Sequence, residues 1–338
     1  MTLTQAARLT KFTILGMAVL LVVGISGYFS YQFWYYRYYL PNKRPVEIAP
    51  DIKYSVLPAP LFPITTVTSS NFQYSLDTET GELPTDLPKI LKVYFIPQLG
   101  TTLLAPNKAR QLSENLGFGF SEQVLSPNIY KFNDETGGEM IIDINTNNFQ
   151  FQKNIASSSA ATKIDLPEDE QIISDFKAYL SSKGLLKEEL KSGRSEVQFN
   201  NFVRRENTSA LVTLWPNDLD KLKIVTPTFK QGLIQATLTR TPDGLIYKDL
   251  VYTYFEPDFE NSSTYPLRPI EQAFNDLKTG SGVVIVSPEK GKASLTNIYL
   301  AYFEPGEYAK YLQPIYVFEG EGFVAYIPAI SDKYLEKK

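Results

Sequence analysis

One stretch of the chain, residues 12–36, carries apolar and aromatic side chains throughout and no charged residue, with Lys11 before it and Arg37 after it. A helix of roughly 20 apolar residues crosses the hydrocarbon core of a bilayer, so this stretch is long enough for a single membrane span. The backbone must be helical there, because lipid offers no partners for open N–H and C=O groups. Its far end gathers rings that suit the headgroup level of a membrane: Tyr28, Phe29, Tyr31, Phe33, Trp34, Tyr35 and Tyr36.

A cleaved secretory signal is the alternative for this stretch, because Arg8 and Lys11 ahead of an apolar core also fit such a signal. The core runs into Tyr, Phe and Trp residues, which are poor at a cleavage site, so we expect residues 1–36 to be a cytoplasmic tail and a retained anchor. Basic residues on both sides give a weak orientation signal, but a short tail ahead of a large C-terminal part favours a cytoplasmic N-terminus. The predicted location is the plasma membrane, single-pass, with the C-terminal domains outside the cytoplasm.

Proline-rich sequence follows the anchor, and the prolines lie at positions 41, 45, 50, 58, 60 and 63. Proline at this density favours an extended, semi-rigid backbone without internal hydrogen bonds. We therefore predict a stalk over residues 37–63, and an irregular segment packed on the following domain is the alternative.

The first folded unit is expected over residues 64–153, in the order strand, helix, hairpin. The predicted elements are a strand at 92–96, a helix between Pro106 and Gly117, and strands at 128–133 and 139–145 joined by a turn at Gly137-Gly138. Met140, Ile142 and Ile144 fall on one face of the last strand, which predicts that one face of the sheet is buried and the other is open.

A second unit is expected over residues 168–338, after a small and polar linker at 154–167. Its predicted elements are helices at 168–183 and 269–280 and strands at 196–205, 210–215, 232–240, 246–255, 295–303, 314–319 and 323–327. The predicted fold class is α+β, with mostly antiparallel sheets and helices packed on one face.

Composition removes several classes of function. The 338 residues contain no histidine and no cysteine, which excludes Ser–His–Asp and Cys–His catalysis and any histidine-bound zinc site. The absence of cysteine favours a bacterial envelope over a disulfide-rich secretory setting. A formal net charge of −4 gives no reason to expect nucleic acid as a partner.

The tetrapeptide Tyr-Phe-Glu-Pro occurs twice, at 254–257 and 302–305, and each copy ends a predicted strand. Its carboxylates, Glu256 and Glu304, are candidates for the acid and base of a glycosidase. Solvated strand ends are the alternative interpretation, which we favour.

Two further patterns are weaker. Ser174 and Lys177 form an S-x-x-K on a predicted helix, with Lys-Thr-Gly at 278–280, but that tripeptide falls at a helix end rather than on a strand. The oxygen-rich stretches at 77–82 and 133–138 do not fit the spacing of a calcium loop, so we expect hairpin turns there. No catalytic, cofactor-binding or metal-binding residue is predicted.

A family resemblance covers residues 269–329. The segments PIEQAFNDLK, IYLAYFEP, LQPIYVFEG and FVAYIPA follow one another there. This order resembles the C-terminal part of the YycI/YycH-type membrane-anchored regulators and the wider PepSY-like folds. The resemblance implies a PepSY-like fold and a regulatory role outside the membrane through contact with a sensor kinase, and it implies no catalytic residue.

The anchor and the resemblance together predict a non-enzymatic, membrane-anchored protein that binds and regulates a protein or peptide partner in the cell envelope. The expected partner is an envelope or membrane protein or a peptide, with a sensor kinase among the candidates, and an exposed sheet edge is one surface that accepts such a peptide. The first alternative is a structural envelope component that self-assembles as a homo-oligomer. The second is an envelope hydrolase acting through carboxylates.

Overall fold

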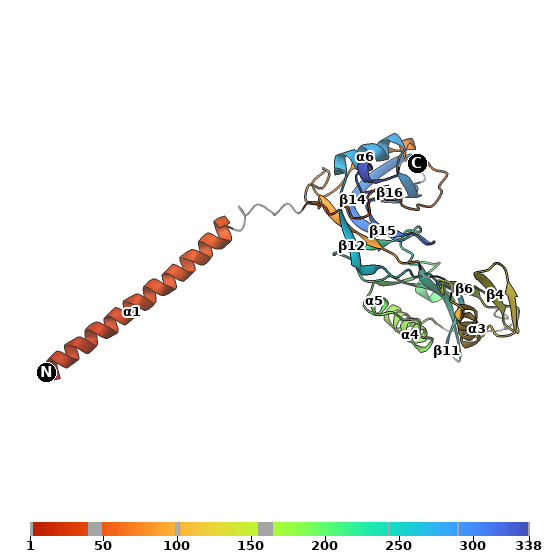
Figure 1. Ribbon diagram of the computed structural model, residues 1–338, viewed down its shortest axis with the longest axis horizontal. Coiled ribbons are helices and arrows are strands. Elements are labelled where there is room, and N and C mark those ends of the chain that lie inside the picture. The colour runs from red at the N-terminus through yellow and green to blue at the C-terminus, as the bar shows by residue number, and fades with distance from the viewer. Residues whose placement is uncertain are drawn as a thin grey trace. The chain divides into compact units, whose positions relative to one another are not determined.

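The computed structural model describes residues 3–39, 49–98, 100, 102–154, 165–242, 244–288 and 291–336 (Figure 1). The chain divides into two compact units, Met1–Ala49 and Pro50–Lys338.

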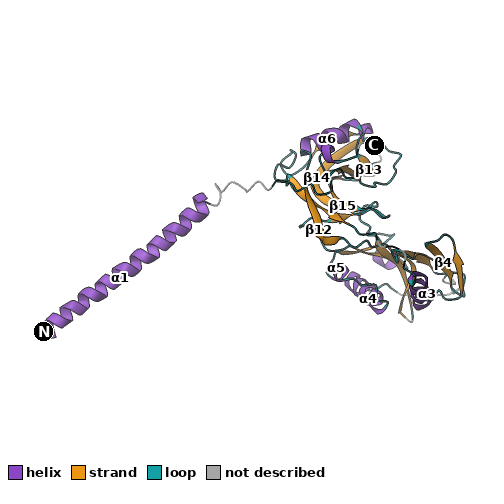
Figure 2. Ribbon diagram, in the orientation of Figure 1, coloured by secondary structure: helices purple, strands orange, loops and turns teal. Residues whose placement is uncertain are grey.

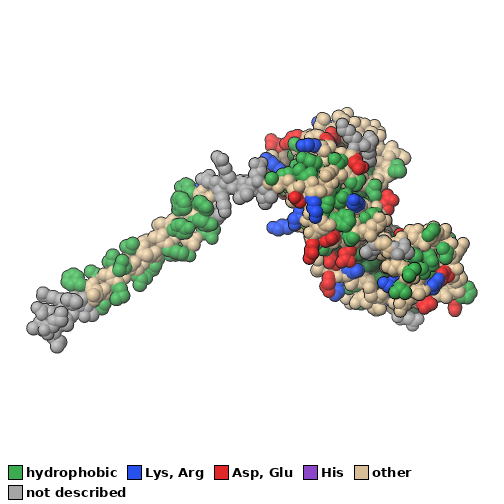
Figure 3. All heavy atoms as spheres, in the orientation of Figure 1, with side chains coloured by type: hydrophobic (Ala, Val, Ile, Leu, Met, Phe, Trp, Pro, Cys, Tyr) green, Lys and Arg blue, Asp and Glu red, His purple; other side chains and the backbone are tan. Residues whose placement is uncertain are grey.

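The first unit is a single long helix. Helix α1 runs over Leu3–Trp34 and continues into a π-helical turn, η1, at Tyr35–Tyr39. Residues Lys11–Tyr39 are long and apolar enough to cross a membrane, and none of them is buried; hydrophobic side chains stand out along this helix (Figure 3). The predicted apolar helix is therefore confirmed, and it is consistent with single-pass anchoring.

The predicted interface aromatics gather at the C-terminal end of this helix. Tyr31 and Tyr35 stack with ring centroids 5.9 Å apart, and Tyr35 and Tyr39 stack with centroids 5.2 Å apart. Gln32 donates a hydrogen bond to the Tyr28 hydroxyl at 3.0 Å. Tyr31, Tyr35 and Tyr39 thus form one stacked column along the last turns of the helix.

The second unit contains two eight-stranded sheets (Figure 2). The C-terminal sheet has the central order β1-β14-β15-β16-β13, with β2, β9 and β12 joined to it. Its strands are β1 Gln73–Leu76, β2 Ile90–Phe95, β9 Ile224–Val225, β12 Asp258–Pro266, β13 Val283–Val286, β14 Lys292–Phe303, β15 Tyr311–Gly320 and β16 Phe323–Pro328.

The middle sheet has the order β3-β4-β5-β6-β11-β10-β8-β7. Its strands are β3 Ser121–Val124, β4 Ile129–Asn133, β5 Glu139–Asp143, β6 Phe149–Gln152, β7 Ser195–Gln198, β8 Ser209–Leu214, β10 Ile234–Thr241 and β11 Gly244–Tyr252. Among the described strands only the β1–β14 and β9–β14 pairs are parallel. The predicted α+β class with mostly antiparallel sheets is confirmed at this level.

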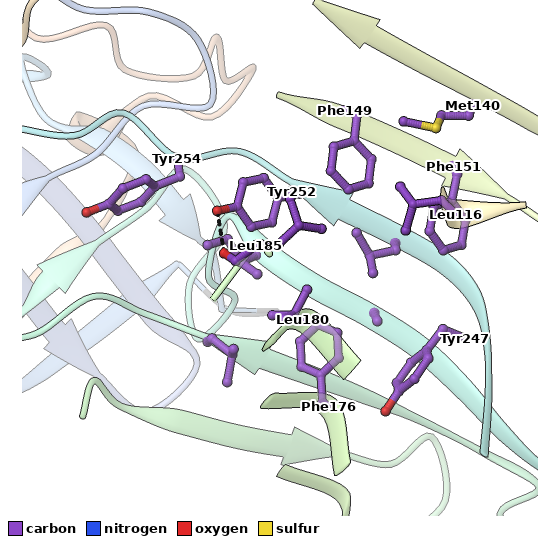
Figure 4. Close-up of a cluster of buried hydrophobic side chains, with 14 of the residues drawn as sticks. Leu116, Met140, Phe149, Phe151, Phe176, Leu180, Leu185, Tyr247, Tyr252 and Tyr254 are labelled. Atoms are coloured by element: carbon purple, nitrogen blue, oxygen red, sulfur yellow. Dashed lines mark hydrogen bonds between the residues drawn. The ribbon is translucent and has the colours of Figure 1, made fainter. Parts of the chain in front are cut away.

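Helices cover one face of the middle sheet. These are α3 Ala105–Leu116, α4 Asp169–Ser182 and the short α5 Glu188–Lys191. Ile172, Phe176 and Leu180 of α4 are fully buried, and the Phe176 ring lies 5.4 Å from that of Tyr247 on β11 (Figure 4). Met140 and Ile142 are buried in the same core, as the alternation along β5 predicts.

The C-terminal sheet is covered on both faces. Helix α6, Ile270–Thr279, packs Ala273 and Leu277 against one face, and Phe62 and Phe229 pack against the other. The central strand β15 is consequently buried at every position from Tyr311 to Phe318. A strand covered on both faces reads as a continuous apolar run rather than an alternation.

The two sheets do not follow the predicted division at residues 154–167. Strand β2, from the predicted first unit, pairs with β12 and β15 of the C-terminal sheet. Strand β6, also before the predicted linker, pairs with β11 after it. The chain therefore crosses between the sheets several times, because the strands that pair are distant in sequence. Residues 155–164 of the predicted linker lie outside the described residues.

Much of the predicted stalk belongs to the folded unit, which corrects that prediction. Residues 40–48 lie outside the described residues, but Leu57 is buried and donates its N–H to the Tyr334 carbonyl at 2.8 Å. The Pro58 carbonyl accepts a hydrogen bond from Gln313 at 2.8 Å. Apolar side chains between the prolines supply this packing, which a proline count alone does not reveal.

The remaining described elements are short. They are the 3-10 turns η2 Ser69–Asn71, η3 Arg204–Glu206 and η4 Asp332–Tyr334. The predicted strand at 196–205 is wrong beyond Gln198, because the chain bends away and forms η3.

Candidate functional site

The segment from Thr253 to Pro257 carries the chain from β11 of the middle sheet to β12 of the C-terminal sheet. Two hollows lie against it. The larger one, here called the outer cleft, has a volume of about 960 Å³. The smaller one, the inner cavity, has a volume of about 210 Å³. Four residues line both hollows: Tyr254, Phe255, Pro257 and Phe259.

The outer cleft is lined by polar and charged groups from both sheets. Lys108 lies on α3, Lys183 and Lys187 lie just after α4 and just before α5, and Asp258 and Glu260 come from β12. The remaining polar wall is the β5–β6 turn, with Asp143, Asn145, Thr146, Asn147 and Asn148. Phe259 is 44% exposed and forms an apolar spot on the wall. This mixture of fixed polar groups and aromatic surface is typical of a binding site.

The inner cavity has a different character. Its wall is largely apolar and includes Leu219, Ile224 and Leu312. Its ionisable groups are two carboxyls, Glu189 on α5 and Glu304 just after β14, and the Tyr254 hydroxyl. Phe259, which is partly exposed, lines both the inner cavity and the outer cleft.

Glu304 is the unusual residue of this site, since only 5% of it is exposed. Burial raises the pKa of its carboxyl to about 8, and a hydrogen bond from the Phe255 N–H opposes this change only in part. The backbone holds the position firmly, because the Glu304 N–H donates to the Val225 carbonyl at 2.9 Å. Burial therefore favours the neutral form of the Glu304 carboxyl near pH 7.

The other copy of Tyr-Phe-Glu-Pro places its carboxylate differently. Glu256 is exposed, and its Oε2 lies 3.3 Å from Lys187 Nζ across the outer cleft. Glu256 and Glu304 nevertheless share a neighbourhood, because both raise the pKa of Tyr254 after the larger effects of burial and of Glu189. The Tyr254 hydroxyl donates to Glu189 Oε2 at 3.4 Å.

The structure thus brings the predicted carboxylate pair near one tyrosine but gives its members unequal environments. The residue that shares the inner cavity with Glu304 is Glu189 rather than Glu256. Sequence reasoning missed Glu189, because it lies on a helix of four residues among ordinary surface charges.

The S-x-x-K pattern is not assembled into a site. Ser174 and Lys177 lie on α4 at the middle sheet, whereas Lys278 ends α6 at the C-terminal sheet. Lys177 Nζ donates to the Lys191 carbonyl at 2.8 Å, and partial burial lowers the pKa of its ammonium.

The oxygen-rich stretches form turns. Asp134 Oδ1 accepts the N–H groups of Thr136 and Gly138 at 2.8 and 2.7 Å and so closes the β4–β5 hairpin, as predicted. The stretch at 77–82 also turns, with Gly81 N–H donating to the Thr78 carbonyl at 3.0 Å, but it follows β1 and joins no hairpin. Within the described parts of the chain, no group of three or more His, Cys, Asp or Glu residues is placed to hold a metal ion.

Comparisons with known proteins leave the family open. No family model matches the chain, and no curated protein matches it. The chain is similar to an uncharacterized protein from Eubacterium rectale ATCC 33656, whose crystal structure at 1.45 Å resolution shares 14% identity with it at a TM-score of 0.37, over 74% of this chain and 86% of that one. Similarity at this level supports no conclusion on function, so membership of the YycI/YycH-type regulators stays a prediction.

Proposed function

We propose that this protein is a membrane-anchored, extracytoplasmic binding protein that holds a segment of a protein or peptide partner in its outer cleft and thereby regulates that partner. The observation that carries the proposal is the outer cleft itself. Its volume of about 960 Å³ lies at the upper end of the range of ligand sites, and groups from both sheets converge on it.

The lining of the cleft suits a peptide. Asn147 and Asn148 on the β5–β6 turn offer side-chain amides of the kind that pair with a peptide backbone, although Asn148 Oδ1 already accepts the Tyr254 N–H at 3.0 Å. Lysines on one wall and acids on the other fix the direction of a polar segment. Phe259 offers an aromatic surface for one of its apolar side chains.

The apolar helix α1 supports the membrane part of the proposal. An anchored domain meets a partner in the same membrane at a high effective concentration, so a modest affinity is sufficient for regulation. A membrane protein with an extracytoplasmic segment, such as a sensor kinase, is the partner class that the family resemblance favours.

The test uses three exposed phenylalanines as reporters in the full-length protein, each replaced in turn by the photoreactive p-benzoylphenylalanine. Phe259 lies in the cleft wall, Phe202 is fully exposed in the loop after β7, and Phe120 lies beside the edge strand β3. We expect irradiation of cells to capture a partner from position 259 and not from position 202. Capture of nothing at 259, or of the same proteins at both positions, contradicts the proposal.

Self-assembly is the second candidate function, and the edge strand β3 favours it. All four residues of β3 are exposed, and neighbouring Phe120 is 70% exposed. An open edge with apolar side chains pairs readily with another strand. This candidate predicts a ladder of self-linked species from position 120.

An envelope hydrolase is the third candidate, favoured by the two carboxyls in one cavity. The raised pKa of Glu304 is that of a general acid at neutral pH. The purified full-length protein would then cleave peptidoglycan or peptide bonds, and Glu304→Gln would abolish the cleavage.

A further inference from the structure

Glu304 and Glu189 meet no cation within the part of the chain that the structure describes. The ion pairs there involve other acids, and neither carboxyl lies within 4.0 Å of a lysine or arginine nitrogen. Acids almost never become fully buried without a partner. The buried Arg268 shows the usual arrangement, because it pairs with Asp276 and Asp332.

The walls around the two carboxyls suit a cation with an apolar stem. Tyr254, Phe255 and Phe259 surround the cavity, and the faces of such rings attract ammonium and guanidinium groups. Leu219 and Leu312 complete the wall and would cover methylene groups. The cavity volume of about 210 Å³ is several times the roughly 30 Å³ of one water molecule, so it accepts a chain of several heavy atoms.

We propose that the inner cavity is a subsite for the alkylammonium or guanidinium group of a lysine or arginine side chain, carried by the partner segment that lies in the outer cleft. This inference rests on the proposed function, since the two hollows share Tyr254, Phe255, Pro257 and Phe259. Glu304 and Glu189 hold the charge, and Phe259 guides the stem from the cleft into the cavity.

Binding of a cation in the inner cavity changes the protonation of Glu304. Burial keeps Glu304 protonated below about pH 8, and a cation beside it favours the ionised form. A proton is therefore released on binding, and the affinity rises with pH up to about 8. The other ionisable groups at this place are Glu189 on α5, the Tyr254 hydroxyl, and Glu256, whose charge is offset by Lys187.

The experiment is a calorimetric titration of the full-length protein in nanodiscs with a blocked pentapeptide, Gly-Gly-Lys-Gly-Gly, and with the same peptide acetylated at its lysine Nε. We expect the acetylated peptide, and the Glu304→Gln variant with the free peptide, to bind at least about tenfold more weakly. The amide of Glu304→Gln matches the shape of the neutral acid, so the fold is retained. Glu188→Gln is the matched control and should change the affinity by less than about twofold, because that exposed carboxylate, next to Glu189 on α5, lines neither the outer cleft nor the inner cavity.

Each outcome decides the inference. Titrations in two buffers of different ionisation enthalpy should show proton release for the wild type and none for Glu304→Gln. Equal binding of the free and acetylated peptides, or no binding of either, overturns the inference. Spermidine tests whether the ligand is a free polyamine. If spermidine binds more tightly than the peptide and displaces it, the assignment to a partner side chain is wrong.

Failure of this inference is distinguishable from failure of the proposed function. Capture of a partner from position 259 that persists unchanged in Glu304→Gln would reject the cationic subsite and leave the binding function standing. Peptide binding without any captured partner would support the cationic subsite and reject the proposed binding of a partner in the outer cleft.

Discussion

The carboxyl group of Glu304 accepts a hydrogen bond from the backbone N–H of Phe255, so the end of β14 is joined to the segment that leaves the middle sheet. Burial outweighs this bond and raises the pKa of Glu304 from 4.5 to about 8. The folded state therefore binds more protons than the unfolded state between these pH values. Stability from this group is complete below about pH 4.5 and is lost as the pH rises to about 8.

Glu304→Gln should remove this dependence, because the amide does not titrate. As the pH rises from about 5 to about 8, we expect the wild type to lose stability relative to the variant. The relative loss should amount to a few kcal/mol of unfolding free energy. Urea unfolding followed by tryptophan fluorescence measures it. Glu256→Gln, at an exposed and paired carboxylate, is the control and should show the same pH dependence of stability as the wild type. If Glu304→Gln also showed the wild-type pH dependence, the argument from burial would be wrong.

Arg268 links the C-terminal segment to α6 through ion pairs and hydrogen bonds. Its Nη1 lies 2.7 Å from Asp276 on α6, its Nη2 lies 2.7 Å from Asp332, and the guanidinium also donates to the Ile330 carbonyl at 3.3 Å. The arginine is buried and Asp276 is partly buried, whereas Asp332 is largely exposed, so removal of the arginine leaves Asp276 and the Ile330 carbonyl without their partner. We expect Arg268→Ala to cost about 2–3 kcal/mol in urea unfolding.

The control for this prediction is Arg110→Ala. Arg110 also makes a short ion pair, with Glu122 at 2.6 Å, but both side chains are partly exposed. A pair of this kind contributes less than about 1 kcal/mol. Equal losses for the two variants would show that burial does not set the strength of the Arg268 contacts.

Gly320 is required by a close approach between two strands. A Cβ atom at this position would lie 1.9 Å from the Ser294 carbonyl oxygen, next to the register shift between β14 and β15. Backbone cannot yield as a flexible side chain does, so Gly320→Ala should cost at least about 2 kcal/mol. Gly306→Ala meets nothing within 4 Å and should be neutral or slightly stabilising. Thermal unfolding of the two variants gives the comparison, and similar midpoints would refute it.

The local elements could be predicted from the sequence because their signals are local. Helix α3 has an apolar stripe, a proline at its start and Gly117 at its end, and α6 has the same features. Strand β12 was missed because Asp258, Glu260 and Asn261 give it a polar pattern. Its strand character comes from pairing with β2, more than 160 residues earlier, and no local pattern contains that information.

The candidate site was only partly predictable for the same reason. The repeated Tyr-Phe-Glu-Pro motif drew attention to both glutamates, but two identical tetrapeptides cannot reveal that Glu304 is buried and Glu256 is exposed. Glu304 lies where β9 pairs beside the end of β14, and its N–H bonds to the Val225 carbonyl of β9, whereas Glu256 has no such neighbour among the described strand pairs. Glu189 joins the site only when α5 packs near Tyr254, which no spacing in the sequence indicates.

Helix α1 and its continuation η1 form an apolar stretch over Lys11–Tyr39 in which no residue is buried. Arginine near the middle of a spanning helix costs about 2.5–3.5 kcal/mol of insertion free energy. We expect the double substitution Leu20→Arg and Val23→Arg to move the protein from the carbonate-resistant membrane fraction to the soluble fraction. Gln32→Arg, near the end of the helix, should stay in the membrane, because a long basic side chain there reaches the interface.

The same helix allows the predicted orientation to be tested. Alkaline phosphatase fused after the C-terminal unit is active only outside the cytoplasm, so an N-terminus inside the cell requires an active fusion. The double-arginine variant of that fusion should lose this activity, because its C-terminal unit is no longer carried across. An inactive wild-type fusion would place the outer cleft in the cytoplasm, and the partner would then have to be sought on that side of the membrane.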